Sequence, residues 1–290
     1  MLSSEAASHS ATVLSISIFI VVALLFQWFA KRNGLYRLPK TTWNEPSWQL
    51  RHILTIFIIY ILVMAIIPNL ALTLLKKGGS KIPRLKLTAI MQWVSIAGPA
   101  IFLTLVCAIW MRKQTWSMWK SRQGQTFWGD IGFGILYWAL SLPVVFAVNQ
   151  FFEMMTSIAF DAAVKDQVAV LYLRSSMASP FYFATALIAI VIAAPFIEEF
   201  IFRCCLQGYL RKHIGSKSAI LVTALVFSLF HYATAQGFTN IPILTSLFTL
   251  AIYLGWVFEK RQSLWASIGM HMTFNAANVG YILTTMEKVS

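Results

Sequence analysis

The sequence predicts an all-α fold, a polytopic bundle of about eight transmembrane helices, from three observations. The 290 residues are 58% hydrophobic and only 11% charged, with a mean hydropathy of +0.70, whereas soluble domains carry about 25% charged residues. Several apolar runs are close to the ~20 residues that span a bilayer as a helix. Strand-like alternation is missing, and lipid accepts only helices or closed barrels. These features exclude a water-soluble globule.

The predicted spans follow the apolar runs in chain order. They cover residues 11–30, 53–75, 89–111, 131–149, 180–200, 218–236, 241–258 and 263–284. We expect the first run to be a retained span, because a signal peptide begins with positive charge and this terminus contains Glu5 and no Lys or Arg before residue 31. The N-terminus is then expected outside the cell.

The net charge of +13 is explained by membrane topology and does not indicate binding to nucleic acid. With the N-terminus outside, most basic residues fall in cytoplasmic loops, as the positive-inside rule requires. One loop, 76–88, conflicts with this topology because it is basic and falls outside. Pro68 indicates a break in the second span, so the count of the second and third spans stays open. The cytoplasmic basic residues are Lys31, Arg32, Arg37, Lys40, Arg51, Arg112, Lys113, Lys120, Arg122, Arg211, Lys212, Lys217, Lys260 and Arg261.

The distribution of polar residues divides the chain into three parts. Residues 1–150 contain four N-terminal spans, which themselves hold few ionisable groups. Residues 151–179 form the longest polar gap, which is expected to lie at the membrane interface as an amphipathic segment. Residues 180–285 form a helical core that contains both intramembrane histidines and a cluster of charges. We therefore expect a functional site after residue 180.

The segment IAAPFIEEFIFRCCLQGYL, residues 192–210, carries three charges in an apolar helix. Glu199 and Arg203 are four residues apart and can form an ion pair within the helix, whereas Glu198 points about 100° away and needs a partner from another element. A simpler interpretation is a helix end whose charges reach water at the cytoplasmic surface. Against it, apolar residues continue past the charges, and an ionisable residue inside a membrane is a candidate functional residue.

Later spans supply candidate partners for this cluster. The sixth predicted span places His231 near its middle, with Phe227 one turn earlier and able to pack on the imidazole. The eighth presents His271 and Asn275 on one face. Such residues also serve as core contacts or as hydrogen bonds between helices. Together with Glu198, however, they form a set of a base, two imidazoles and an amide donor that can activate water and stabilise an oxyanion.

Three motifs give this sequence a resemblance to a known family. EEFIFR fits EExxxR, FSLFH fits FxxxH, and HMTFN fits HxxxN, in this order and each on its own hydrophobic run. The arrangement resembles the CPBP family of membrane proteins. That family includes the type II CAAX prenyl endopeptidases, the Abi bacteriocin-immunity proteins and proteins like lysostaphin-resistance protein A. The resemblance covers residues 180–284.

The resemblance implies an intramembrane glutamic endopeptidase that is reached from the cytoplasmic side and uses no metal or other cofactor. By motif, Glu198 would be the general base that polarises a water together with His231. His271 and Asn275 would stabilise the tetrahedral oxyanion. The supporting residues would be Glu199, Arg203 and Phe227.

Other classes of protein remain open at this point. Glu198, His231 and His271 could ligate zinc with water in the fourth position, although the sequence has no HExxH motif. A catalytically silent protein that binds a peptide, such as a bacteriocin self-immunity protein, would use the same cavity. A proton-coupled transporter would also need intramembrane Glu and His, but no pair of broken helices related by internal symmetry is visible.

The expected partners are the lipid bilayer and a substrate that is a membrane-associated protein or peptide, with or without a lipid attached. Compact loops and a short N-terminal tail without a targeting motif favour a multi-pass protein of the bacterial plasma membrane.

Overall fold

The computed structural model describes residues 2–39, 48–77, 124–160 and 168–286, with a few single positions between 83 and 121. These residues form helices and no strands, which confirms the all-α prediction. Within the described ranges, four helical stretches are long and apolar enough to cross a membrane. They are Ala11–Arg32, Phe127–Phe160, Pro180–Leu229 and Thr234–Arg261. The fold is that of an all-α, multi-pass membrane protein.

Three long helices form the first half of the described structure: α1 (Leu2–Arg32), α2 (Leu50–Lys77) and α5 (Phe127–Phe160). The break expected at Pro68 is wrong, because α2 is helical throughout. Most of the predicted third span, 89–111, and most of the loop before it lie outside the described residues.

The polar gap after the fourth span is built differently from the prediction. α5 has 34 residues, which is about 51 Å of helix, so it extends well beyond a hydrocarbon core of about 30 Å. The first ten residues of the predicted interfacial segment, 151–160, are therefore the end of α5. A separate short helix, α6 (Val168–Ser176), follows and packs against α7 (Pro180–Leu187).

The glutamate-bearing segment is one continuous helical rod with two π-helical stretches. α7 begins after Ser179 with Pro180 in its first turn, where its missing N–H costs nothing. It continues as η1 (Ile188–Ala193), α8 (Ala194–Glu199) and η2 (Phe200–Gln207), of which η1 and η2 are π-helical. π-Helical turns are rare and are found frequently at functional sites. The predicted span ended at residue 200, so the structure places Glu198 inside a longer helix and not at its end.

The chain turns at Gly215 within α9 (Gly208–Leu229), where φ is 77° and ψ is 161°, a conformation that favours glycine. α9 then ends at Leu229, and a 3-10 turn, η3 (Thr234–Thr239), follows. The sixth span, predicted over 218–236, is therefore too long at its C-terminal end. His231 lies in the turn after α9 and not in the middle of a helix.

The last two helices agree closely with the predicted spans. α10 covers Asn240–Arg261 and α11 covers Leu264–Met286. α11 has 23 residues and is long enough to cross a membrane, but it is not apolar enough to count among the four stretches named above. The reason is its polar side chains, which include His271 and Asn275.

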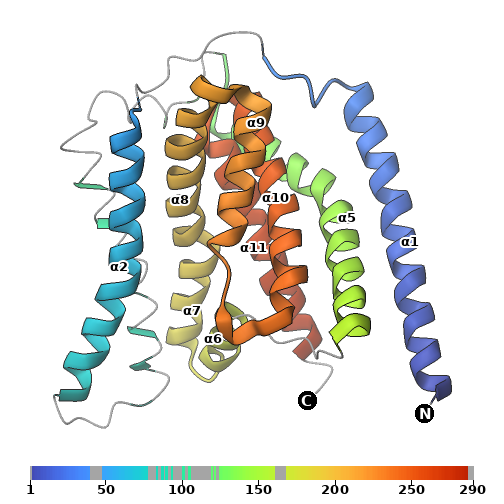
Figure 1. Cartoon of the computed structure of the whole chain (residues 1–290), viewed down its shortest axis with the longest axis horizontal. Helices are drawn as coiled ribbons and strands as arrows, with labels where there is room; N and C mark the ends of the chain where they lie inside the picture. Colours follow the sequence, from blue (N-terminus) through green and yellow to red (C-terminus); the bar gives the residue numbers. More distant parts are fainter. Residues whose placement is uncertain are drawn as a thin grey trace.

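The described helices run in the directions that the predicted topology requires. In Figure 1, α1 and α10 end at the upper end of the view, where α2, α9 and α11 begin. The last turns of α1 and α10 carry Lys31, Arg32, Lys260 and Arg261. By the positive-inside rule, these basic residues favour the upper end as the cytoplasmic one, in agreement with the predicted topology. α1 begins and α11 ends at the opposite end.

Glycines allow α5 and α11 to touch backbone to backbone. A Cβ at Gly134 would collide with the carbonyl oxygen of Ala266 and lie 2.7 Å from the backbone nitrogen of Met270. A Cβ at Gly269 would lie 3.1 Å from Cα of Ile131. Small residues at such crossings are typical of helices that pack in membranes. The crossing fixes α11, the helix of His271, against the long α5.

Candidate active site

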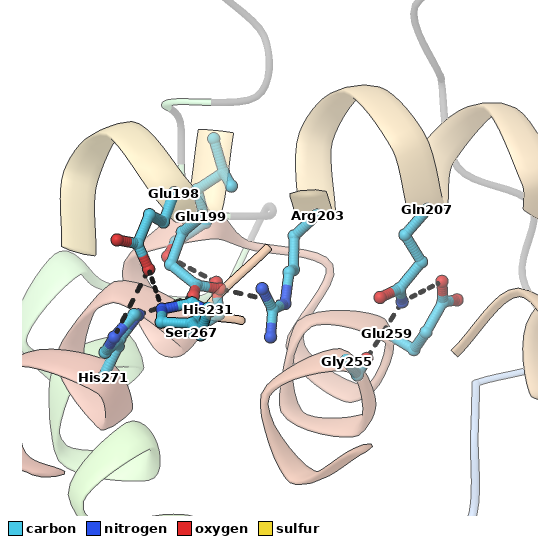
Figure 2. A network of polar contacts seen from close by, with 10 residues as sticks. Glu198, Glu199, Arg203, Gln207, His231, Gly255, Glu259, Ser267 and His271 are labelled. Atoms are coloured by element: carbon cyan, nitrogen blue, oxygen red, sulfur yellow. Dashed lines mark hydrogen bonds and ion pairs between the residues drawn. The ribbon is translucent and has the colours of Figure 1, made fainter. Parts of the chain in front are cut away.

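The two adjacent glutamates contact different partners, as the helix geometry predicted. Glu199 is fully buried, and its Oε2 lies 3.1 Å from Nε of Arg203, so the expected ion pair is present. Its other oxygen, Oε1, lies 2.8 Å from Nδ1 of His271. Glu198 faces away from Arg203 and toward His231 and His271 (Figure 2).

The carboxylate of Glu198 and two imidazoles surround one point. Oε2 of Glu198 lies 3.9 Å from Nε2 of His231 and 3.9 Å from Nε2 of His271. Both distances are too long for direct hydrogen bonds, and this oxygen has no hydrogen-bond partner among the described residues. A gap of this width between polar atoms suits a bridging water.

Both imidazoles are held by their Nδ1 atoms. Nδ1 of His231 lies 2.8 Å from the carbonyl oxygen of Phe227. Because a carbonyl can only accept, this Nδ1 carries the proton, and neutral His231 presents Nε2 as an acceptor. Nδ1 of His271 faces Glu199, which is also an acceptor when ionised. Glu198 Oε2 and the Nε2 atoms of both histidines are then all acceptors, and they face one another. A hydrogen-bond donor must therefore lie between them, either a water or a proton on one imidazole.

Phe227 connects the cluster through its ring. The ring centroid lies 4.7 Å from that of His231, as expected for a residue one turn earlier. It lies 5.9 Å from the ring of His271, and the guanidinium carbon of Arg203 stands 4.7 Å over its face. The ring therefore excludes solvent from one side of the ion pair and fixes the tilt of both imidazoles.

Asn275 contacts a helix backbone in this structure. Its Nδ2 donates to the carbonyl oxygen of Ile190 at 2.8 Å. In the π-helical stretch, Ala194 donates to the carbonyl of Ala189, so Ile190 would receive its bond from residue 195. That residue is Pro195 and has no N–H. Asn275 thus supplies the missing donor and joins α11 to η1, the bridging role that the sequence left open beside an oxyanion role.

The second helix contributes to the site, which the sequence analysis missed. Phe57 of α2 packs edge-on against Phe202 at 5.7 Å and Phe230 at 5.5 Å. Tyr60 packs against Phe230 at 6.2 Å and lies close enough to Glu198 for an electrostatic interaction. A single tyrosine in an apolar run gives little signal in a sequence, although it was the only polar aromatic group of that span.

Fold and site together define a class: a multi-pass helical membrane protein with a partly buried glutamate–histidine centre. Residues 180–277 match the sequence model of the Rce1-like family, described as type II CAAX prenyl endopeptidase Rce1-like. The matched segment is about a third of the chain and contains all three motifs, so the comparison supports the resemblance of this segment to the CPBP family that the motifs indicated. No curated protein and no solved structure matches the chain.

Proposed function

We propose that this protein is an intramembrane endopeptidase that hydrolyses a peptide bond of a membrane-associated protein or peptide near the cytoplasmic face of a bacterial plasma membrane. The observation that carries the proposal is the position of Oε2 of Glu198, 3.9 Å from Nε2 of two imidazoles. The similarity of residues 180–277 to a family of endopeptidases supports the same reaction class.

In the proposed reaction, a water held by Glu198 and His231 attacks the carbonyl carbon of the scissile bond. Glu198 takes a proton from this water as the new C–O bond forms, and it later gives a proton to the leaving nitrogen as the C–N bond breaks. General acid–base catalysis of this kind contributes about 100- to 10,000-fold. His231 is 31% exposed and Glu198 18% exposed, so substrate would enter on this side.

His271 is suited to stabilise the oxyanion when it carries a second proton. Its Nδ1 is held by Glu199, so an imidazolium presents Nε2–H on the side of Glu198. The charges of Glu198, Glu199, Arg203 and a protonated His271 then sum to zero. A balanced set matters in a buried site, because an uncompensated charge is costly there.

The spacing of the three acceptors is wide for a zinc site. Ligand atoms about 2.0–2.2 Å from a tetrahedral zinc lie about 3.4 Å apart, whereas Glu198 lies 3.9 Å from each histidine. No cluster of His, Cys, Asp and Glu in the described ranges has metal-binding geometry. We therefore expect prolonged treatment with a strong zinc chelator to leave turnover unchanged. Loss of turnover with recovery on adding stoichiometric zinc would instead establish a metallohydrolase.

A panel of peptides tests the proposed function. The full-length protein would be reconstituted in liposomes with peptides that end in a CAAX-like tetrapeptide, with and without a farnesyl group on cysteine, and with an unmodified hydrophobic helix. Mass spectrometry should detect a pair of products from at least one peptide. Saturable binding without cleavage of any peptide would favour the silent, immunity-type alternative.

A further inference from the structure

Arg203 carries buried N–H groups that its ion pair does not use. Its side chain is fully buried, with Nε against Glu199 and the guanidinium against the ring of Phe227. Neither Nη1 nor Nη2 meets an acceptor among the described residues. Each unsatisfied donor of a buried charged group is strongly unfavourable, so an acceptor is required close to these nitrogens.

Gln207 offers a buried acceptor one turn further along the same helix. Its Nε2 donates to the carbonyl oxygen of Gly255 and to Oε1 of Glu259, both at 3.0 Å. Both partners accept, so the orientation of the amide is fixed, and Oε1 is the atom left over. Oε1 is buried with no donor in the described part of the chain. It stands against α10, since a Cβ at Gly255 would lie 2.8 Å from it.

Thr223 of α9 is the third unsatisfied group in this region. It is 1% exposed, and its hydroxyl has no partner among the described residues. Helical threonines here usually donate to the carbonyl four residues earlier, as Thr249 and Thr273 do. The hydroxyl of Thr223 does not, so it is available to a group outside its own helix.

The position of Thr223 follows from its neighbours on α9. Ile220, three residues earlier, lies 3.1 Å from the position of a Cβ at Gly255, beside the amide of Gln207. Phe227, four residues later, covers Arg203. Residues at these spacings share one helix face, so Thr223 lies opposite the gap between Arg203 and Gln207.

We propose that an enclosed water binds between Arg203, Thr223 and Gln207. The water accepts a hydrogen bond from an Nη–H of Arg203 and donates one to Oε1 of Gln207. Its third hydrogen bond is with the hydroxyl of Thr223. Buried waters typically make about three such bonds. The three polar groups come from η2 and α9, and α10 closes the space behind them.

The water joins two polar networks that are otherwise separate. Figure 2 shows Arg203 between the glutamate–histidine cluster and the pair of Gln207 and Glu259. Glu259 is 3% exposed and pairs at 3.0 Å with Arg211, which is 12% exposed. A continuous polar path then runs from the cytoplasmic end of the bundle to Glu199 and His271. On the proposed function, Thr223 and Gln207 are positioning residues, which hold the guanidinium that orients Glu199.

The direction in which one substitution shifts the thermal midpoint tests whether the water is present. Thr223→Val keeps the shape of the side chain and removes the hydroxyl. If a water binds there, the thermal midpoint of the purified full-length protein should fall, by about 2–4 °C or more. If no water contacts the hydroxyl, its removal eliminates an unsatisfied buried polar group, so the midpoint should stay unchanged or rise. Either result would overturn the proposal. Thr223→Ser keeps the hydroxyl and should have a midpoint close to that of wild type.

A double-mutant cycle separates this site from general effects on packing. Thr223→Val combined with Gln207→Met should lower the midpoint no further than the larger single change, because both remove bonds to one water. Ser228→Ala is the matched control, since that buried hydroxyl donates to Leu225 in its own helix. Its effect should add to that of Gln207→Met. Additive shifts for Thr223 and Gln207 would refute a shared water.

The positioning role has a separate readout. In the peptide assay, Thr223→Val should lower kcat by about 10- to 100-fold with little change in KM, because misplacing a catalytic group impairs the chemical step. Thr223→Ser should recover kcat, and Ser228→Ala should leave it unchanged. Equal kcat for Thr223→Val and wild type would refute the positioning role. If no peptide is cleaved by the wild-type protein, the proposed function fails, while the thermal measurements still decide the water.

Discussion

Glu198 and Glu199 are neighbours in sequence but differ in exposure and in partners. Glu199 is 0% exposed and shared between Arg203 and His271, whereas Glu198 is 18% exposed and faces the gap between two imidazoles. Substitutions at the two sides of this helix should therefore have different consequences for folding and for turnover.

Arg203→Ala should lower both the yield and the thermal midpoint of the purified protein. Breaking a buried ion pair by removing one partner costs about 3–5 kcal/mol, because a buried charge is left unpaired. Glu198→Gln should leave both quantities near wild type, since it keeps the buried pair of Glu199 with Arg203 and His271 can balance the lost charge by staying neutral. Arg51→Ala is the control, because Arg51 is exposed on α2. Equal losses of folded protein for Arg203→Ala and Glu198→Gln would contradict these assignments.

Asn275 requires a test that separates its contact with the helix from a role toward substrate. Asn275→Ala removes the donor to the Ile190 carbonyl, a kind of membrane hydrogen bond that averages about 0.6 kcal/mol. Loss of an oxyanion donor would instead lower turnover by about 100- to 1,000-fold. We expect Asn275→Ala to lower turnover by this larger factor, because the second N–H of Nδ2 would donate to the oxyanion. The thermal midpoint should fall only slightly.

Pro195→Ala in the Asn275→Ala background distinguishes the two roles. The new backbone N–H can donate to the Ile190 carbonyl, so the thermal midpoint should recover. Turnover should stay low if the amide acts on the substrate. Recovery of both quantities in the double variant would show that Asn275 only joins two helices, and it would remove this residue from the active site.

At the scale of elements, the contact between α5 and α11 sets the position of His271. Gly134→Ala places a methyl group against the backbone of Ala266 and Met270, and overpacking of this kind costs about 1–3 kcal/mol. It should lower both the thermal midpoint and turnover. Gly132→Ala is a matched control on the same helix, because a Cβ there meets nothing within 4 Å. A Gly134→Ala protein with wild-type stability and turnover would show that the crossing does not position α11.

The sequence predicted contacts between residues one helical turn apart better than contacts between helices. Glu199 with Arg203 and Phe227 with His231 follow from spacing alone, and both are present. The bond of Asn275 to η1 depends on a π-helical turn and a proline in another element, so no local pattern reveals it.

One further pattern in the sequence indicates a polar helix face. Glu199, Arg203, Gln207 and Arg211 recur at every fourth position of the same segment. Such a stripe marks one face of a helix, and in the structure its last two members contact Glu259 of α10. The partner on α10 could not be read from the stripe, because it is set by the packing of η2 against that helix.

Across the whole molecule, the order and direction of the described helices agree with the predicted topology. The third span is not compared, because most of it lies outside the described residues. The turn after α9 was missed because apolar residues continue to Phe230, so hydropathy alone could not place the helix end at Leu229. That turn frees His231 from the helix and lets its imidazole face Glu198. The contribution of α2 was missed for a related reason, since aromatic residues in an apolar span look alike whether they face lipid or a site.

In the proposed reaction, Glu198 activates the water that cleaves the peptide bond. The most direct test compares wild-type protein with Glu198→Gln in liposomes, with the peptide panel and water enriched in oxygen-18. The wild-type protein should release a product with one oxygen-18 atom in its new carboxyl terminus. Glu198→Gln should retain the wild-type thermal midpoint and lower the rate by about 100- to 10,000-fold. Cleavage by Glu198→Gln at the wild-type rate would contradict the account.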